Sequence, residues 1–462
     1  MNELTHKHVL VVGLGTSGEA AARFLLEAGA RVAATDAADT ERLRALKAEF
    51  EHAGARVELG DHSDRVLDGV ELVVLSPGVP PHVTPVRLAD ERRIPVISEI
   101  ELAARYCDAT IVAITGTNGK TTVTHLVHTL LRAGGLECAV AGNVGDPLIG
   151  LVRRARSGDV LAVEVSSFQL ERIERFGPHV AVLLNITPDH MDRYAALDDY
   201  ARAKMRLFEN QTGADVAILH ESVPAAGWSL PANADGPRRI IYGDDAACDL
   251  VLDGDLVLDG DSVVSKPTGR RYDLRGLWRL PGRHTRHNAM AAIAVAEAFA
   301  LETAAICEGL RSFRGLPHRL ELVEEACGVR YINDSKATNV DAVAKALDAV
   351  ESPVILIAGG LDKDLDFEPL RPNVRAWVKT LVLIGEAAPK LARTFADDTE
   401  CVHAASLDEA VGIAKATARP GDVVLLSPGC ASFDMFRDYA DRGDRFKACV
   451  RAAPACAHKT TG

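Results

Sequence analysis

The sequence predicts an α/β protein made of three consecutive α/β domains, at residues 1–98, 99–314 and 315–462. The chain has 462 residues, more than one ordinary domain contains. Short apolar runs alternate with helical patterns along most of its length, which is typical of parallel sheets covered by helices. Two glycine-bearing turns, near residues 13 and 116, each join an apolar run to a helical pattern.

The composition is that of a globular protein with an acidic balance. Apolar residues make up 47% of the chain, charged residues 25%, and the formal net charge is −13. This excess of negative charge argues against a nucleic-acid partner or an anionic membrane surface, but it is compatible with local pockets for small anionic substrates. The chain has no run of about 18 apolar residues and its start lacks a signal-peptide core, so we expect a cytoplasmic protein without membrane insertion.

The first domain alternates predicted strands with predicted helices. We expect strands at 9–12, 31–35, 71–78 and 94–98, and helices at 16–29 and 41–54. The first strand runs into Gly13-x-Gly15-x-x-Gly18, and Asp36 ends the second strand, as in a Rossmann-like dinucleotide fold. The same loop suits an NAD-dependent oxidoreductase or any other binder of a nucleotide diphosphate, so this segment alone leaves both alternatives open.

The central domain is expected to begin with a buried strand at 109–116. A helix follows at 121–135, because Val123, Leu126, Val127, Leu130 and Leu131 recur at helical spacing. Further strands are predicted at 158–167 and 178–187, a small antiparallel addition at 212–280, and a closing helix at 287–302.

The strongest chemical signal is the segment that joins this first central strand to its helix. Its glycines let backbone N–H groups point into a loop, and the start of the following helix favours negative charge. Lys120 can reach terminal phosphates, and Thr121 offers a hydroxyl to Mg²⁺. Ile114 stands where the generic phosphate loop has its first glycine. The segment predicts a P-loop ATPase-like domain that binds ATP through Gly116, Thr117, Asn118, Gly119, Lys120, Thr121 and Thr122.

Two further central residues suit a metal bound beside these phosphates. Glu164 closes the apolar run at 160–163, and His190 follows the next predicted strand. Ligands of open α/β sheets bind beyond the carboxyl ends of the strands, so both side chains are expected at one sheet edge. A carboxylate and an imidazole are suitable ligands for a divalent cation.

The third domain repeats the alternation and is expected to be Rossmann-like, with strands at 331–335, 352–360, 380–385 and 421–429. Polar residues gather after two of these strands, at 333–339 and 427–433. Turn chemistry explains some of them. Asp334 and Lys336 together at a strand end indicate a binding site.

These motifs together resemble the Mur ligase family, the ATP-dependent amide-forming enzymes of peptidoglycan precursor synthesis. The resemblance covers essentially the whole chain and is carried by residues 76–79, 116–122, 164–171, 185–194, 315–321, 333–339 and 426–434. The form of NDSKATN and PDHMDRY is similar to the member that adds D-glutamate to UDP-N-acetylmuramoyl-L-alanine. This resemblance implies an acyl-phosphate intermediate, with ATP, two Mg²⁺ ions and those two substrates, in a monomer whose C-terminal domain closes onto ATP.

The resemblance also implies roles for individual residues. Lys120, His190 and a carbamylated Lys204 would be catalytic, and Thr121, Glu164, His190 and Lys204 would bind metal. ATP would further contact Asn288, Arg319 and Asp334. The first domain would bind the UDP-substrate and the third domain the amino acid. The UDP end would meet Ser17, Asp36, Ser76, Gly78 and Asn143, and the glutamate would meet Lys336, Thr338, Lys363, Ser432 and Phe433.

The sequence differs from the family's usual residues at two positions, and two other functions are alternatives to the one that the resemblance implies. Thr285 stands where the family usually has asparagine, and Phe433 where it often has leucine. A folylpolyglutamate synthetase or another Mur enzyme would fit the ATP loop equally well, and the first and third domains less well. An oxidoreductase would leave the loop at 116–122 and the whole third domain unexplained.

Overall fold

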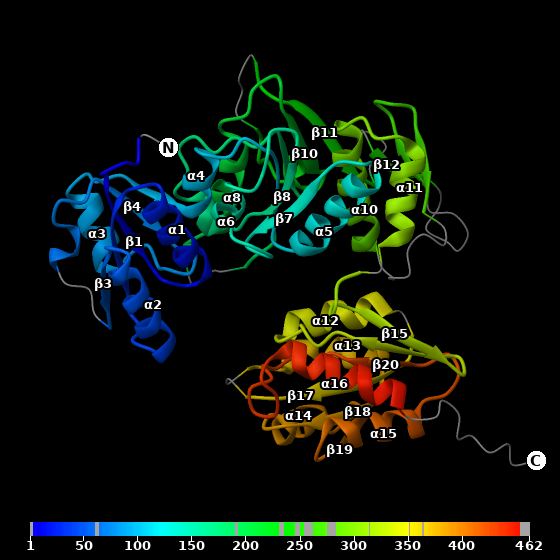
Figure 1. Cartoon of the computed structure of the whole chain (residues 1–462). Coiled ribbons are helices and arrows are strands. Elements are labelled where there is room, and N and C mark those ends of the chain that lie inside the picture. Colours follow the sequence, from blue (N-terminus) through cyan, green and yellow to red (C-terminus); the bar gives the residue numbers. More distant parts are fainter. Residues whose placement is uncertain are drawn as a thin grey trace, which may run out of the picture. The chain divides into compact units, whose positions relative to one another are not determined.

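The computed structural model describes residues 3–60, 64–189, 193–230, 235–244, 250–253, 262–274, 283–313, 315–350, 352–362 and 365–452. The described residues contain sheets of five, nine and six strands (Figure 1). The chain divides into two compact units. The first unit, Met1–Arg275 with His287–Ser312, holds the five-stranded and nine-stranded sheets, and the second, Gly276–Arg286 with Phe313–Gly462, holds the six-stranded sheet. Three α/β sheets confirm the predicted fold class, whereas the predicted domain boundaries stay predictions.

The first sheet is parallel throughout, with strand order β3-β2-β1-β4-β5. Alternate residues of β1 enter two different cores, because Val9 and Val11 pack with α1 and α2, and Leu10 and Val12 pack with α3. Helices therefore cover both faces of the sheet (Figure 1). The elements are β1 (His8–Val12), α1 (Thr16–Glu27), β2 (Arg31–Asp36), α2 (Glu41–His52), β3 (Arg56–Leu59), η1 (Asp64–Leu67), β4 (Leu72–Leu75), α3 (Thr84–Glu91) and β5 (Val96–Ser98).

The nine-stranded sheet has the order β14-β13-β12-β11-β10-β9-β6-β8-β7. Strand β6 lies between β8 and β9 and is parallel to both, so the carboxyl ends of all three meet at one edge. The elements of this half are α4 (Glu99–Ala104), β6 (Thr110–Thr115), α5 (Lys120–Ala133), β7 (Cys138–Gly142), α6 (Leu148–Leu151), β8 (Val160–Glu164), α7 (Ser167–Leu170), β9 (Val180–Leu183), α8 (Leu197–Met205) and η2 (Arg206–Phe208).

The segment predicted as a small antiparallel addition is different in the structure. Strands β10 and β11 continue the parallel sheet beside β9, and β12 is parallel to β11. Antiparallel pairing begins only at β12–β13 and β13–β14. The elements here are β10 (Val216–His220), α9 (Ser222–Ala225), β11 (Arg238–Gly243), β12 (Leu250–Asp253), β13 (Ser262–Ser265), β14 (Arg271–Asp273), α10 (Arg283–Ala298) and α11 (Thr303–Ser312).

The sheet of the second unit has the order β15-β16-β20-β17-β18-β19, and among these strands β15 pairs antiparallel. Its two faces bury separate apolar clusters, with Leu356 in one and Ile355 in the other. The elements are β15 (Glu321–Ala326), β16 (Val329–Asn333), α12 (Val340–Val350), β17 (Val354–Gly359), η3 (Glu368–Leu370), α13 (Arg371–Trp377), β18 (Val378–Ile384), α14 (Ala388–Phe395), β19 (Glu400–His403), α15 (Leu407–Thr417), β20 (Val423–Leu426) and α16 (Tyr439–Ala452).

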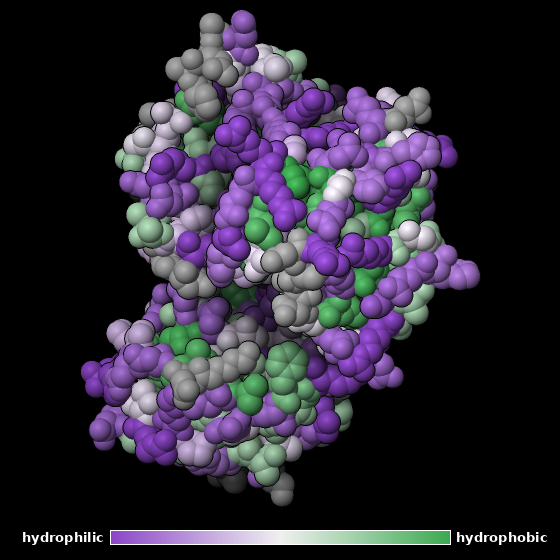
Figure 2. All heavy atoms as spheres, turned by 90° about the vertical axis from the view of Figure 1, so that its left-hand side faces the viewer, coloured by the Kyte–Doolittle hydropathy of each residue, from purple (hydrophilic) through white to green (hydrophobic). Residues whose placement is uncertain are grey.

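The surface is mainly hydrophilic on the face drawn in Figure 2, where apolar residues form separate groups among polar ones. Within the described ranges, no helix is long and apolar enough to cross a bilayer.

Candidate active site

The loop between β6 and α5 depends on two glycines with positive φ. Gly116 has φ 152°, and Gly119, at the helix N-cap, has φ 87° in the left-handed region. A Cβ on Gly116 would lie 3.0 Å from Cβ of Leu184, so the loop also needs glycine for its close approach to the segment after β9. The loop therefore turns sharply and brings the first N–H groups of α5 to the carboxyl edge of the sheet.

The segment after β9 holds this loop in place. Asn118 N–H donates to Oδ1 of Asn185 (2.9 Å), and Nδ2 of Asn185 donates to the Asn118 carbonyl (3.0 Å). The Thr117 hydroxyl donates to the Thr187 carbonyl (3.1 Å) and accepts from the Thr187 N–H (3.0 Å). Sequence reasoning did not select Asn185, although its place directly after a strand was an available signal.

Two lysine side chains converge on one carbonyl of the loop. Nζ of Lys120 donates to the Gly116 and Thr117 carbonyls, each at 2.9 Å. Nζ of Lys204, from α8, donates to the same Gly116 carbonyl at 2.9 Å and lies 4.4 Å from the centre of the Tyr200 ring. The structure thus places Lys204 at the loop between β6 and α5, and its role in binding metal stays a prediction.

Lys204 is 1% exposed, and this environment changes its acid–base behaviour. Burial and, to a lesser extent, the charge of Lys120 lower the pKa of Lys204 to about 7, while Asp189 and Glu164 oppose the shift. A lysine with this pKa has a large neutral fraction near pH 7, which an exposed lysine does not have.

Glu164 ends β8 beside the loop and is 3% exposed. Its Oε1 accepts a hydrogen bond from Nδ2 of Asn143 at 2.8 Å. Its Oε2 is buried and has no hydrogen-bond partner among the described residues. An unpaired buried carboxylate oxygen is costly, so this atom fits a bound divalent cation.

The rest of the expected metal site is only partly described. Thr121 lies in the first turn of α5, beside the loop that Lys120 closes. His190 lies outside the described residues. The described residues contain no group of three or more His, Cys, Asp or Glu side chains placed to hold a metal. Glu164 and Thr121 are therefore the described residues whose chemistry suits Mg²⁺.

Asn288 and Asn143 join this central group. A Cβ on Gly119 would lie 2.7 Å from Oδ1 of Asn288, so the amide of Asn288 abuts the left-handed turn. Asn143 follows β7 and contacts Glu164. Of the residues expected at the UDP end, Asn143 thus lies in the central sheet beside the expected metal ligand.

The other residues expected at the UDP end lie at the carboxyl edge of the first sheet. Oδ2 of Asp36 accepts the Leu14 N–H (2.7 Å), and Oδ1 accepts the Ala38 N–H (2.9 Å). Ser76 follows β4 and is buried, whereas Gly78 is exposed in the next turn. Ser17 is half-buried in the first turn of α1.

In the second unit, Asp334 follows β16 and is buried. Its Oδ2 accepts from the Ser427 hydroxyl at 2.8 Å, and its Oδ1 from the Leu320 N–H at 3.2 Å. Burial raises the pKa of Asp334 to about 7, although both hydrogen bonds and the charge of Arg319 oppose the shift. Arg319 and Asp334, both expected at ATP, are thus electrostatic neighbours.

The residues expected to bind the glutamate differ in their solvent exposure. Ser432 is 2% exposed, whereas Phe433 is 66% exposed and Thr338 is also exposed. Nζ of Lys336 lies 5.2 Å from the centre of the Tyr439 ring. Lys363 lies outside the described residues.

Arg442, which sequence reasoning did not select, joins the two polar loops of this unit. It is fully buried, donates from Nη2 to the Ser335 carbonyl (2.9 Å), and donates from Nη1 to the Cys430 carbonyl (3.1 Å). The segments around Lys336 and Ser432 are therefore held by one guanidinium on α16.

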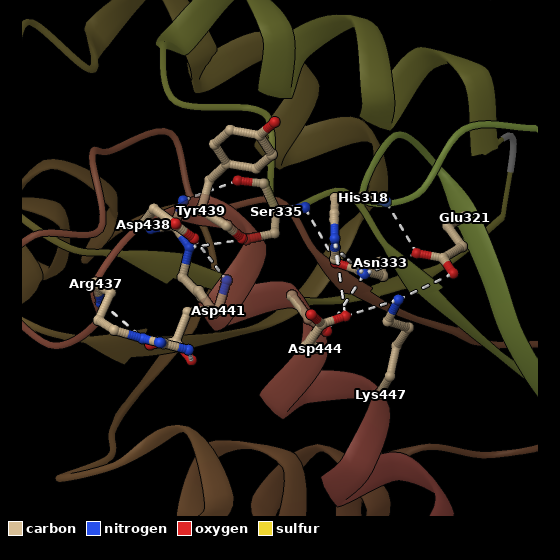
Figure 3. Close-up of polar contacts among 12 residues, drawn as sticks. His318, Glu321, Asn333, Ser335, Arg437, Asp438, Tyr439, Asp441, Asp444 and Lys447 are labelled. Carbon is tan, nitrogen blue, oxygen red and sulfur yellow. Dashed lines mark hydrogen bonds and ion pairs between the residues drawn. The ribbon is translucent and has the colours of Figure 1, made fainter. Parts of the chain in front are cut away.

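The turn that carries Arg319 is held by a second polar group, shown in Figure 3. Nδ1 of His318 lies 3.0 Å from Nδ2 of Asn333, and Oε2 of Glu321 accepts from the His318 N–H at 2.9 Å. Lys447 on α16 pairs with Asp444 at 2.9 Å. Burial and the charge of Lys447 lower the pKa of His318, so its ring is mainly neutral near pH 7.

Comparison with family models gives one result for each of the three sheets. Residues 7–98 match "Mur ligase MurD-like, N-terminal domain", residues 114–296 match "Mur ligase middle domain", and residues 318–430 match "Mur ligase, glutamate ligase domain".

Curated relatives match nearly the whole chain. A protein of Geobacter sp. (strain M21) is 44% identical over 97% of this chain and 98% of its own, and one of Desulfatibacillum aliphaticivorans is 40% identical over 98% and 100%. Both are named UDP-N-acetylmuramoylalanine--D-glutamate ligase.

Solved structures share the fold at low identity. MurF ligase from Thermotoga maritima in complex with ADP has a TM-score of 0.60 and 16% identity, covering 98% of this chain and 100% of that one. UDP-N-acetylmuramate-alanine ligase MurC from the same organism has a TM-score of 0.58 and 18% identity, covering 97% and 100%. With three matching domain models and relatives above 40% identity at full length, the chain belongs to the Mur ligase family.

Proposed function

We propose that this chain is the ATP-dependent ligase that adds D-glutamate to UDP-N-acetylmuramoyl-L-alanine in peptidoglycan precursor synthesis. The observation that carries the proposal is identity of 40–44% over 97–98% of the chain with proteins named for that activity. The alternative of a folylpolyglutamate-type or other Mur ligase is not favoured, because relatives of the D-glutamate ligase match all three domains closely.

The reaction joins a carboxylate to an amine, which water alone does not favour. The alanyl carboxylate oxygen attacks the γ-phosphorus of ATP, and ADP leaves. The glutamate amine then attacks the acyl carbon and loses a proton, and inorganic phosphate leaves from the tetrahedral intermediate. We propose that Lys120 neutralises the γ-phosphate; in support, its ammonium lies at the loop between β6 and α5, 2.9 Å from two carbonyls of that loop.

We propose that the metal is Mg²⁺ and that two ions bind. Thr121, Glu164 and His190 would hold it, together with Lys204 in its carbamylated form. The support from this chain is the buried, unpaired Oε2 of Glu164 at the loop. When bound, Mg²⁺ supplies positive charge that offsets the negative charge of the transferring phosphate.

Lys204 is proposed to react with CO₂, as the family resemblance implied. The neutral amine attacks the carbon of CO₂, a C–N bond forms, and a proton is released, which leaves an anionic carbamate. Burial and the charge of Lys120 favour the neutral amine, because they lower the pKa of Lys204 to about 7. A carbamate would also place a negative group next to the ammonium of Lys120.

The substrates are proposed to occupy the three domains 1–98, 99–314 and 315–462 in turn. UDP would bind at the carboxyl edge of the first sheet, with Ser17, Asp36, Ser76, Gly78 and Asn143 as proposed contacts. ATP would also contact Asn288, Arg319 and Asp334, and glutamate Lys336, Thr338, Lys363, Ser432 and Phe433. We propose a monomer located in the cytoplasm.

The test is release of inorganic phosphate with ATP, Mg²⁺ and UDP-N-acetylmuramoyl-L-alanine, comparing D- and L-glutamate. We expect release that requires both co-substrates and is selective for the D isomer. Lys120→Ala should abolish turnover and leave binding of the UDP-substrate nearly intact, because Lys120 belongs to the ATP loop. Turnover by this variant would contradict the loop assignment, and release without glutamate dependence would contradict the proposed activity.

A further inference from the structure

A chain of hydrogen bonds connects the carboxyl end of β10 to the beginning of α10, next to the ATP loop. The Ser222 N–H donates to Nδ1 of His220 (3.1 Å), and the Ser222 hydroxyl lies 2.8 Å from the same nitrogen. Nε2 of His220 lies 3.2 Å from Nδ1 of His287. Nε2 of His287 lies 3.1 Å from Oδ1 of Asp244, which follows β11. We call these four residues the histidine relay.

The direction of every bond in the relay follows from its first donor. A backbone N–H can only donate, so Nδ1 of His220 must accept and its proton must be on Nε2. That proton is donated to Nδ1 of His287, whose own proton is then on Nε2 and is donated to Asp244. The geometry therefore assigns both imidazoles as neutral and fixes both tautomers.

His287 of the relay directly precedes Asn288 on α10. Because a Cβ on Gly119 would lie 2.7 Å from Oδ1 of Asn288, the first turns of α10 determine where this amide meets the ATP loop. The ring of His287 is held between His220 and Asp244, so both β10 and β11 fix this part of α10. The ring centres of the two histidines are 4.7 Å apart, and His220 also contacts Tyr242 edge-on at 5.3 Å.

We propose that His220 and His287 are positioning residues for nucleotide binding, which hold Asn288 against the ATP loop only while both imidazoles are neutral. This inference rests on the proposed ATP-dependent function. It does not require contact between either histidine and the nucleotide.

The same geometry argues against a metal between the two rings. A metal ligand uses the lone pair of one ring nitrogen and carries its proton on the other. If Nε2 of His220 bound a metal, Nδ1 would carry a proton directed at the Ser222 N–H. The pair is therefore better suited to sharing a proton than to holding a cation.

Protonation of either ring must break one bond of the relay. A proton on Nδ1 of His220 would face the Ser222 N–H, and a proton on Nδ1 of His287 would face the N–H of His220. Every bond of the relay is therefore present only while both imidazoles are neutral.

The test compares relay variants of the full chain by their KM for ATP and by calorimetric titration with a non-hydrolysable ATP analogue. His287→Ala should raise the KM for ATP roughly tenfold, the loss expected from a broken hydrogen-bonded contact, with kcat within about twofold. His220→Phe keeps a ring against Tyr242 but removes the donor, and should have the same effect. His287→Gln keeps an acceptor and a donor, so its KM for ATP should stay near that of the unmodified chain.

The matched control is His179→Gln. His179 also pairs with an aspartate, Asp215 at 3.1 Å, but it precedes β9 at the opposite end of the sheet from the ATP loop. It should change neither the KM for ATP nor the affinity for the analogue. Unchanged analogue binding in both His287→Ala and His220→Phe would overturn the proposal. An unmodified chain without ligase activity would instead contradict the proposed function, and analogue binding would still report on the relay.

Discussion

Glu99 offers a sharp test of how burial controls charge in this fold. It is the first residue of α4 in the first unit and is 0% exposed. Its Oε1 accepts the Ile149 N–H at 2.7 Å, while Oε2 is buried without a hydrogen-bond partner among the described residues. Burial raises the pKa of Glu99 to about 7, although the Ile149 hydrogen bond opposes the shift. We predict that Glu99→Gln stabilises the protein at alkaline pH.

The sign and size of this stability change follow from the difference between the pKa of Glu99 in the folded protein and its pKa in the unfolded chain. In the unfolded chain Glu99 loses its proton near its ordinary value of 4.5, whereas in the folded protein it keeps the proton up to about pH 7. Its contribution to stability is therefore fully present below pH 4.5 and is lost as the pH rises to 7. At 1.36 kcal/mol for each pKa unit this loss is about 3 kcal/mol, of which about 2 kcal/mol falls between pH 5.5 and 8.5. A glutamine at position 99 keeps the shape of the side chain and the oxygen that accepts the Ile149 N–H, but it does not titrate.

The assay is urea unfolding of both proteins at pH 5.5 and 8.5. The stability of Glu99→Gln relative to the unmodified chain should rise by about 2 kcal/mol between these pH values. Glu101, two residues along α4, is the matched control. Burial raises its pKa, but the N–H groups of residues 174–176 and Arg105 outweigh this and hold the pKa below the ordinary value. Glu101→Gln should therefore destabilise the protein, most at high pH. A Glu99→Gln difference that does not change with pH would refute the reasoning.

Two further predictions concern the central cluster. Glu164→Gln replaces the unpaired carboxylate oxygen, so the Mg²⁺ concentration for half-maximal activity should rise by roughly tenfold or more, as a metal titration of phosphate release would measure; an unchanged titration would exclude Glu164 as a ligand. Activity should fall in CO₂-free buffer and recover with bicarbonate, most clearly above pH 7, where Lys204 is mainly neutral. Carbon NMR with labelled bicarbonate should detect the carbamate in the unmodified chain and not in Lys204→Ala.

The sequence was a good guide to buried strands and a poor guide to short or edge strands. Strand β6, which is buried from its second residue to its last, was predicted within one residue at each end. Strand β3 was missed because it has only four residues and only one of them is fully buried. Strand β7, at the edge of the central sheet, was missed because alanine and glycine supply much of it. Side-chain patterns report burial, and these strands bury little.

The antiparallel pairing predicted for 212–280 is present from β12 to β14 but was wrong for β10 and β11, for a related reason. The acidic, turn-rich part of this segment suggested hairpins, and the apolar runs of β10 and β11 at its start were not given separate weight. Both runs join the parallel sheet beside β9. Whether a strand pairs parallel depends on the connection that follows it, and composition does not reveal this.

The candidate site divides into what local motifs reveal and what only the tertiary fold reveals. Residues 116–122 are one continuous segment, a turn followed by the start of α5, so their motif alone was sufficient to predict a phosphate site. The Lys204 contact with the Gly116 carbonyl joins residues 88 positions apart, and without the family resemblance Lys204 would count as an exposed helix lysine. The histidine relay joins three elements, and no spacing in the sequence predicts it.

The three glycines of the first domain's pattern, at positions 13, 15 and 18, have different surroundings in the structure. A Cβ on Gly18 would lie 1.7 Å from the Gly13 carbonyl oxygen, and one on Gly13 would lie 2.5 Å from Val79, so close packing favours glycine at both positions, and the φ of 87° favours it further at Gly13. The carboxylate of Asp36 already accepts two backbone N–H groups, those of Leu14 and Ala38. Only Gly15 has open space, with no atom within 4 Å of its Cβ position, at the N-cap of α1. The part of the pattern that is left open is thus one helix N-terminus, which suits a phosphate, and nothing in the pattern specifies a nicotinamide.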